Sequence, residues 1–186
     1  MVHAQTPITV ALELHGKFAP EDVEAIAINT YWVAERYVDR KNALWHPATR
    51  ETADHSIPYC VATALLDGDI TAASFSEERI RDPRITALIG RTTIRENPEY
   101  SKAHPHEWPC RIGLTARGGA RKSAEARYFK GHAQNPLSDA EIETKFRALA
   151  AGVLAPQQIN AILATAWRLE KLADIGELLA LFEFRG

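Results

Sequence analysis

The most informative part of the chain is residues 50–68, RETADHSIPYCVATALLDG. Apolar residues recur at helical spacing in its second half, and Gly68 suits the C-terminal end of a helix. Pro58 is tolerated only in a first turn, so we expect the helix to begin close to Ser56. The polar residues before it would then lie where backbone N–H groups point outward and favour an anion.

Helices and strands are expected on both sides of this stretch. The patterns predict helices at residues 6–16, after 71, at 83–89 and from 138, 156 and 174, and strands at 23–31, 91–96, 110–115 and 126–129. Residues 32–49 show no clean period and are expected to be irregular, and residues 97–109 carry three prolines and are expected to form a loop. Because strands and helices do not alternate strictly, we expect the α+β class, with a small antiparallel sheet of about four strands packed with several helices.

Composition limits the function classes. The chain has 186 residues, of which 46% are hydrophobic and 25% charged, as in ordinary globular proteins. A net charge of −2 gives no electrostatic footprint for nucleic acid or an anionic membrane. No apolar run approaches the ~18 residues of a membrane span. The two cysteines indicate no disulfide scaffold, so we expect a reduced, cytoplasmic protein without nucleic-acid or membrane partners.

Residues 50–59 carry the densest group of reactive side chains. Arg50 can bind a carboxylate with two parallel hydrogen bonds, and a histidine such as His55 can act as an acid or a base. His55 and Tyr59 are four residues apart and would share a helix face. The same pattern also fits a helix cap with a surface histidine and a core tyrosine, and spacing alone leaves both interpretations open.

Two further groups could contact an acidic ligand. His3 and Gln5 precede or begin the first helix, and Lys130 stands in a glycine turn. An exposed chain end and a solvated loop explain the same residues. Cys60 lies within a predicted helix, where a buried, unreactive thiol is expected. His104 stands in a proline-rich loop without a distant set of metal ligands, so no metal site is predicted there.

Several segments together resemble the MmgE/PrpD family. They are HAQT (3–6), RETADHSIPY (50–59), ALLDG (64–68), DPRI (82–85), KGH (130–132) and NPLSDAE (135–141), in the same order and register along nearly the whole chain. The resemblance implies one domain over residues 1–186, similar to the family's lid-like α+β C-terminal domain. It implies that the family's N-terminal all-helical domain is absent, and that the active site lies in the cleft between the two.

The resemblance also implies a chemistry. Family members include 2-methylcitrate dehydratase, cis-aconitate decarboxylase and an iminodisuccinate epimerase, which act next to a carboxylate of a small polycarboxylate. We expect a metal-free hydro-lyase similar to 2-methylcitrate dehydratase of propionate catabolism, without a cofactor and incomplete as an isolated chain. Two cysteines cannot supply the three ligands of an aconitase-type cluster. The alternatives are a non-catalytic dimerisation or partner-binding module, and decarboxylation or epimerisation of a related acid.

The same resemblance assigns roles to six residues. It implies catalytic roles for His55 and His3 and substrate-binding roles for Arg50, Lys130, Gln5 and Tyr59. It implies no metal ligand. The expected partners are a small polycarboxylate substrate, a separate helical-domain chain and a second copy of the chain in a homodimer.

Overall fold

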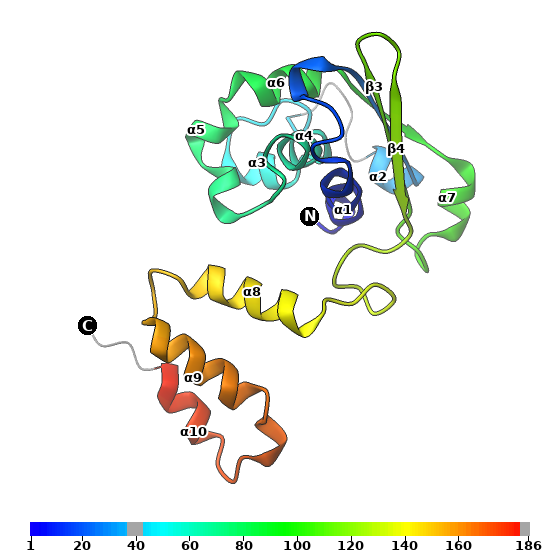
Figure 1. The fold of residues 1–186 in the computed structure, drawn as a ribbon. Coiled ribbons are helices and arrows are strands. Elements are labelled where there is room, and N and C mark those ends of the chain that lie inside the picture. Colours follow the sequence, from blue (N-terminus) through cyan, green and yellow to red (C-terminus); the bar gives the residue numbers. More distant parts are fainter. Residues whose placement is uncertain (37–42, 183–186) are drawn as a thin grey trace. The chain divides into compact units, whose positions relative to one another are not determined.

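The computed structural model describes residues 1–36 and 43–182 (Figure 1). The chain divides into two compact units, Met1–Asn135 and Pro136–Gly186. Two compact units can belong to one domain, so the single-domain prediction for residues 1–186 stays a prediction. In the part of the chain that is described, no helix is both long and apolar enough to cross a membrane.

Most of the expected elements are present in the first unit. Its helices are α1 (Gln5–Leu14), α2 (Trp32–Arg36), α3 (Arg50–Asp54), α4 (Ile57–Asp67), α5 (Glu77–Ile80), α6 (Pro83–Gly90) and α7 (Pro98–Ala103). Its strands are β1 (Val23–Thr30), β2 (Thr92–Glu96), β3 (Cys110–Ala116) and β4 (Arg121–Ala126). Short 3-10 helices cover Val2–Ala4, Pro20–Asp22 and Ala72–Phe75. The predicted α+β class is confirmed.

The described strands form one sheet in the order β2-β1-β3-β4. β3 pairs antiparallel with both β1 and β4, whereas β1 and β2 pair in parallel. The sheet is therefore mixed, which corrects the expectation that all pairs are antiparallel. The physical reason is the connection: α2 to α6 lie between β1 and β2 in the chain, and a crossover of that length permits parallel pairing.

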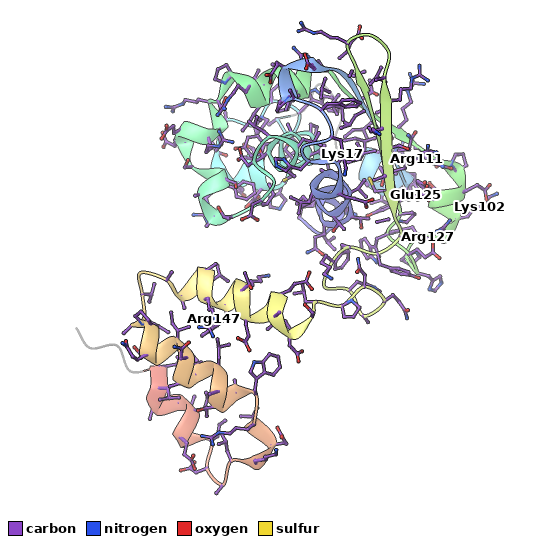
Figure 2. The ribbon with its side chains drawn as sticks, in the orientation of Figure 1. Lys17, Lys102, Arg111, Glu125, Arg127 and Arg147 are labelled. Carbon is purple, nitrogen blue, oxygen red and sulfur yellow. The ribbon has the colours of Figure 1, made fainter. Side chains whose placement is uncertain are left out.

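One face of the sheet carries the hydrophobic core. Ile26, Ile28, Ile112 and Leu114 alternate inward from β1 and β3 and are buried. α1 contacts β3, β4 and α4, so it lies between α4 and the sheet (Figure 1). On the other face of β3 and β4, exposed side chains at paired register positions include Arg111 and Glu125 (Figure 2).

The ends of α4 follow the sequence prediction. The Ser56 hydroxyl accepts a hydrogen bond from the Tyr59 N–H, and Pro58 lies in the first turn. Gly68 ends the helix in the left-handed conformation, with φ at 71°. The His15 ring lies against it: a Cβ there would stand 2.7 Å from that ring, whose Nδ1 donates to the Leu65 carbonyl at 2.9 Å. Both the backbone angle and the close ring therefore require glycine.

Three segments differ from the sequence prediction. α7 forms inside the predicted 97–109 loop because the Asn97 side chain caps its first turn and Pro98 is its first residue. α2 forms at the start of the predicted irregular stretch 32–49, of which residues 37–42 lie outside the described residues. The return strand is β4 rather than 126–129, because the tight turn at Gly118 and Gly119 sets the register that begins at Arg121.

The second unit is helical, as expected from residue 138 onward. It contains α8 (Asp139–Ala150), α9 (Pro156–Ala166), α10 (Gly176–Leu179) and 3-10 helices at Leu169–Lys171 and Ala180–Phe182. Ser138 and Glu141 form the predicted capping box at the start of α8. Asp174 accepts a hydrogen bond from the Gly176 N–H at 2.8 Å, near the start of α10.

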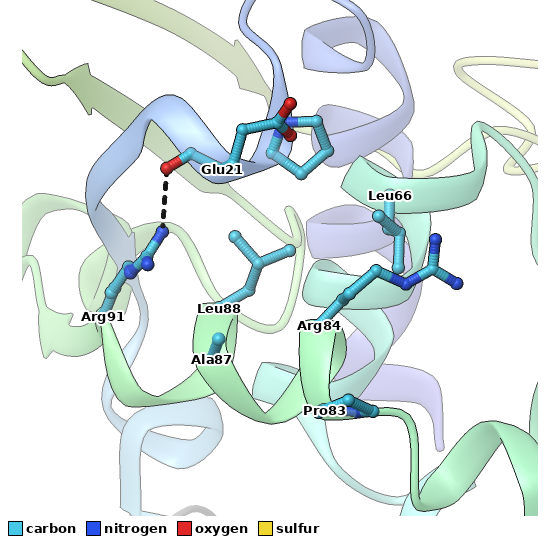
Figure 3. A pocket seen from close by; sticks show the side chains of 8 residues that line it. Glu21, Leu66, Pro83, Arg84, Ala87, Leu88 and Arg91 are labelled. Carbon is cyan, nitrogen blue, oxygen red and sulfur yellow. Dashed lines mark hydrogen bonds between the residues drawn. The ribbon is translucent and has the colours of Figure 1, made fainter.

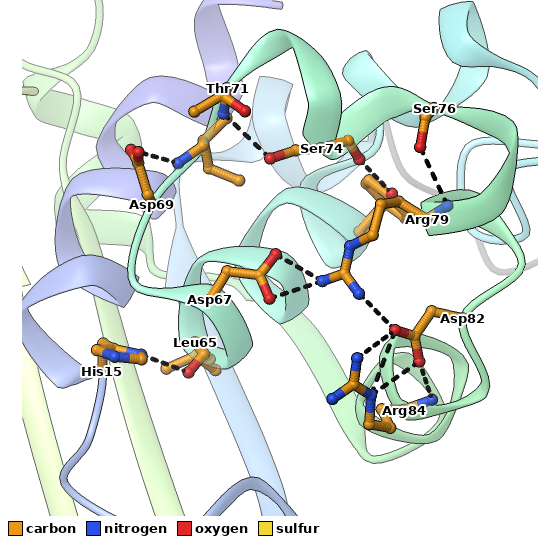
Figure 4. A network of polar contacts seen from close by, with 12 residues as sticks. His15, Leu65, Asp67, Asp69, Thr71, Ser74, Ser76, Arg79, Asp82 and Arg84 are labelled. Atoms are coloured by element: carbon orange, nitrogen blue, oxygen red, sulfur yellow. Dashed lines mark hydrogen bonds and ion pairs between the residues drawn. The ribbon is translucent and has the colours of Figure 1, made fainter. Parts of the chain in front are cut away.

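An ion-pair network joins α4, α5 and α6 (Figure 4). Arg79 donates to both carboxylate oxygens of Asp67, at 2.6 and 2.5 Å, and also binds Asp82. Asp82 caps α6 by accepting from the Arg84 N–H at 2.8 Å, and its side chain is only 11% exposed. Hydrogen bonding to Arg84, reinforced by the Arg79 charge, lowers the pKa of Asp82 from 3.8 to about 2.

This network predicts an acid-sensitive contribution to stability. We expect Asp82→Asn to lower the free energy of unfolding by about 1–2 kcal/mol at pH 7, since asparagine keeps the helix cap but loses the charge. Because folding lowers the pKa, the contribution is present above 3.8 and is lost as the pH falls toward 2. Urea unfolding at pH 7 and pH 3 measures both effects.

Glu77→Gln is the matched control for that experiment. Glu77 pairs with Arg81 one helical turn away, and both side chains are more than 75% exposed. An exposed pair of this kind contributes at most about 0.5 kcal/mol. Equal losses for Asp82→Asn and Glu77→Gln would contradict the role assigned to the network.

Candidate functional site

A histidine–tyrosine pair lies at the start of α1. His3 belongs to the 3-10 helix Val2–Ala4, and Tyr31 directly follows β1. The His3 Nδ1 and the Tyr31 hydroxyl are 2.7 Å apart. Tyr31 is only 2% exposed, and burial raises the pKa of its hydroxyl far above neutral. Burial is also the main cause that lowers the pKa of His3, so both partners are uncharged at neutral pH.

Two further rings enclose this pair. The His104 ring stacks on the Tyr31 ring, with centroids 4.2 Å apart and planes at 14°. Trp108 meets the His104 ring edge-on at 5.1 Å and lies 5.8 Å from the His3 ring. Because all four rings are in mutual contact, residues 3, 31, 104 and 108 form one aromatic cluster, called the His3 cluster below.

The Lys130 loop lies against the N-terminal half of α1. The Lys130 N–H donates to the Thr9 hydroxyl at 3.1 Å, and that hydroxyl donates to the Gln5 carbonyl at 3.0 Å. Phe129 meets Trp108 edge-on at 6.3 Å, which joins the loop to the His3 cluster. The fold therefore gathers three of the predicted residues, His3, Gln5 and Lys130, around the start of α1.

Arg50 and His55 lie at opposite ends of α3. Arg50 is the first residue of that helix and is exposed. The His55 Nδ1 contacts the Asp54 carboxylate and lies 3.0 Å from the Glu51 carbonyl, which favours a proton on Nδ1 and a lone pair on Nε2. The N-terminal amine of Met1 donates to the Asp54 carbonyl at 3.4 Å. The segment that carries His3 therefore lies close to Asp54, the residue before His55.

Tyr59 takes a different place from the one expected. It is fully buried, and its hydroxyl donates to the Ser74 carbonyl at 2.6 Å. His55 ends α3, whereas Tyr59 lies in α4 beyond the extended backbone of Ser56, so the two do not share a helix face. The burial favours the core-tyrosine alternative, and the substrate contact expected of Tyr59 stays a prediction.

The cysteines are buried and unreactive. Burial raises the pKa of Cys60 to about 12 and raises that of Cys110 as well, so neither thiol ionises near neutral pH. The prediction of a buried thiol at residue 60 is confirmed. Among the described residues, no group of three or more His, Cys, Asp or Glu side chains is placed to hold a metal ion.

A pocket of about 460 Å³ lies between Pro20–Asp22, α4 and α6 (Figure 3). None of the six predicted site residues lines it. Of its two guanidinium groups, Arg91 donates to the Glu21 and Val23 carbonyls, and Arg84 pairs with Asp82. Because existing partners engage both groups, the pocket is a poor place for a polycarboxylate.

Comparison with known proteins decides the family. A family model described as the MmgE/PrpD C-terminal domain matches residues 1–169. The chain belongs to the MmgE/PrpD family. This confirms the resemblance carried by the segments between residues 3 and 141, and the match runs across both compact units.

Curated relatives of this MmgE/PrpD chain carry two kinds of name. The 2-methylcitrate dehydratase of Cupriavidus necator is 35% identical over 175 residues, which cover 88% of this chain and 36% of that protein. The cis-aconitate decarboxylase of Mus musculus is 27% identical over 89% of this chain and 33% of its own length. That of Homo sapiens is 30% identical over 80% and 30%. The chain thus spans about a third of the length of these relatives, whose names are those of lyases.

Sequence reasoning missed part of the cluster in this MmgE/PrpD domain. Tyr31 was assigned only to the end of a strand, His104 was considered only as a metal ligand, and Trp108 was not considered. A usable signal is that a polar aromatic residue directly follows the interior strand β1, since residues just beyond strand ends often belong to functional sites. The contact of residues 3, 31 and 104 depends on long-range packing, which spacing does not encode.

The place of Tyr59 predicts a stability effect. We expect Tyr59→Phe to lower the free energy of unfolding by about 1 kcal/mol, because the ring packing stays while the buried Ser74 carbonyl loses its donor. Urea unfolding measures the loss. Tyr128→Phe is the control, since this tyrosine is only half-buried and its ring stacks on His132. Unchanged stability in Tyr59→Phe would show that its hydroxyl is free for another role.

Proposed function

We propose that this chain supplies part of the active site of a lyase that acts on small polycarboxylates, with 2-methylcitrate dehydration as the first candidate reaction. The observation that carries the proposal is the 2.7 Å contact between His3 and Tyr31 in a chain of the MmgE/PrpD family. The 35% identity to a 2-methylcitrate dehydratase favours that reaction. Since the chain spans about a third of such relatives, the other active-site groups would come from a helical-domain partner.

His3 is the proposed acid–base group. Tyr31 is too buried to touch a substrate, so it acts by holding the His3 ring. When Nδ1 carries the proton and donates it to the phenol oxygen, Nε2 keeps a lone pair and can accept a proton. In dehydration, that proton leaves the carbon next to a carboxylate and its electron pair forms the new double bond. The bond to the β-hydroxyl breaks, and the departing oxygen takes a proton and leaves as water.

Arg50, Lys130 and Gln5 are the proposed carboxylate-binding residues. All three are exposed, so a polyacid can reach them. A guanidinium binds a carboxylate through two parallel hydrogen bonds, and an ammonium or amide adds charge or a further donor. His55, oriented by Asp54, would donate to or accept from the same substrate. All four residues of this paragraph are candidates in the sequence prediction. Tyr59 is left out of the proposal because its side chain is buried.

Decarboxylation of a related acid is the second candidate. The similarity to cis-aconitate decarboxylases over 80–89% of the chain favours it. In that reaction a carbon–carbon bond breaks, carbon dioxide leaves, and the electron pair stays on the carbon. A protonated group then delivers a proton to this carbon. The choice between the two reactions depends on the substrate and on which bond the complete site aligns.

The proposal is tested by co-expression with an all-helical MmgE/PrpD domain, followed by assays on 2-methylcitrate and cis-aconitate. We expect turnover of one acid, and a loss of about 10²–10⁴-fold in kcat/KM for His3→Ala, as for other general acid–base groups. His46→Ala, at an exposed histidine outside the His3 cluster, should leave turnover unchanged. Self-association of the chain without turnover of either acid would favour the non-catalytic module instead.

The carboxylate contacts give a separate prediction. Arg50→Ala and His55→Ala should each lower kcat/KM, with Arg50→Ala acting mainly through KM. Arg50→Lys should recover only part of the loss, because an ammonium keeps the charge without the two-pronged donor geometry. A change of less than about threefold, equivalent to ~0.7 kcal/mol, in both alanine variants would remove these residues from the site.

A further inference from the structure

His104 has one feature that packing does not explain. Among the described residues, its Nε2 is buried and has no hydrogen-bond partner. A buried polar atom without a partner destabilises a fold, and a phenyl ring could stack in the same place without that cost. The cost of the buried Nε2 therefore indicates that His104 does more than fill space in the core.

Backbone hydrogen bonds fix the segment that carries His104 and Trp108. The His104 backbone N–H donates to the Tyr100 carbonyl at 3.1 Å, which fixes the residue to the end of α7. The Trp108 N–H donates to the Arg127 carbonyl at 2.9 Å, which fixes the neighbouring ring to the chain beyond β4. The Tyr31 ring thus stacks on a fixed partner, while its hydroxyl meets His3 at 2.7 Å.

We propose that His104 is a positioning residue of the His3–Tyr31 pair: its ring holds the phenol against His3, and its imidazole acts on His3 as a second basic group whose ring lies 6.4 Å away. The proposal deepens the proposed function and rests on it for its catalytic meaning. His104 contacts Tyr31 rather than the reacting atoms, so it acts through the pair.

Charge interactions within the cluster agree with this role. The His3 and His104 rings are 6.4 Å apart, too close for both to be charged at little cost. Burial is the main cause of the low pKa of His3, and His104 and then the Met1 amine lower it further. Burial also lowers the pKa of His104. The other titratable groups at the cluster are the Tyr31 hydroxyl and, behind it, the Cys110 thiol, and both stay protonated at neutral pH.

NMR on the full chain tests both parts without an activity assay. His104→Phe keeps the stacked ring and removes the imidazole. We expect the nuclear Overhauser contact between the Tyr31 ring and His3 to persist, and the His3 titration to move to higher pH because one cause of its lowered pKa is gone. His104→Ala removes the ring as well, and we expect the Tyr31–His3 contact to be weakened or lost.

His106→Phe is the matched control, because His106 lies two residues away in the same loop and is exposed. It should change neither the His3 titration nor the contact. Should His104→Ala fail to fold, His104→Leu keeps the volume without an aromatic ring. An unmoved His3 titration in His104→Phe, or an intact Tyr31–His3 contact in a folded non-aromatic variant, overturns the proposal.

Activity separates this inference from the proposed function. If His3 acts as a base, the acid side of the kcat/KM profile should move to higher pH in co-expressed His104→Phe, because the uncharged form of His3 is then lost at a higher pH. NMR effects as expected, together with full turnover by His3→Ala, would leave the positioning role intact and refute the catalytic role of His3.

Discussion

The burial of α4 is the constraint on which the first unit depends. Every residue from Ile57 to Leu65 is buried, so this helix must be surrounded by other elements. α1 packs against it from the sheet side, and α3 and α6 also contact it. Polar residues stand at the ends of two of these helices: His3 just before α1, and Arg50 and His55 at the two ends of α3. The core thereby decides where His3, Arg50 and His55 come to the surface.

The candidate site consists of two groups of different character. The His3 cluster is enclosed by aromatic rings, where low polarity favours uncharged imidazole and phenol groups. The α3 group is more open, with Arg50 exposed and His55 held by the Asp54 carboxylate. Removing a proton next to a carboxylate needs both characters: a neutral base for the proton and cations for the charge that stays on the substrate.

Membership of the MmgE/PrpD family gives these groups a chemical context. Relatives named as dehydratases and as decarboxylases match most of the chain, yet the chain covers about a third of their length. In the proposed function, the His3 cluster supplies the acid–base group on one side of a shared site. The separate helical-domain chain is the proposed source of the other side, and the homodimer stays a prediction.

The sequence by itself determined the family, the α+β class, the ends of α4 and the capping box of α8, because these follow from local patterns such as Ser56 before Pro58, Gly68 after the last turn, and Glu141 three residues after Ser138. It also marked His3, Gln5, Arg50, His55 and Lys130 as candidates. Only the tertiary structure decided that Tyr59 is a core residue, that β1 and β2 run in parallel, and that Tyr31 and His104 adjoin His3. Those facts depend on contacts between residues as many as 101 positions apart in the chain, and such contacts are set by the packing of the whole core rather than by neighbours in the sequence.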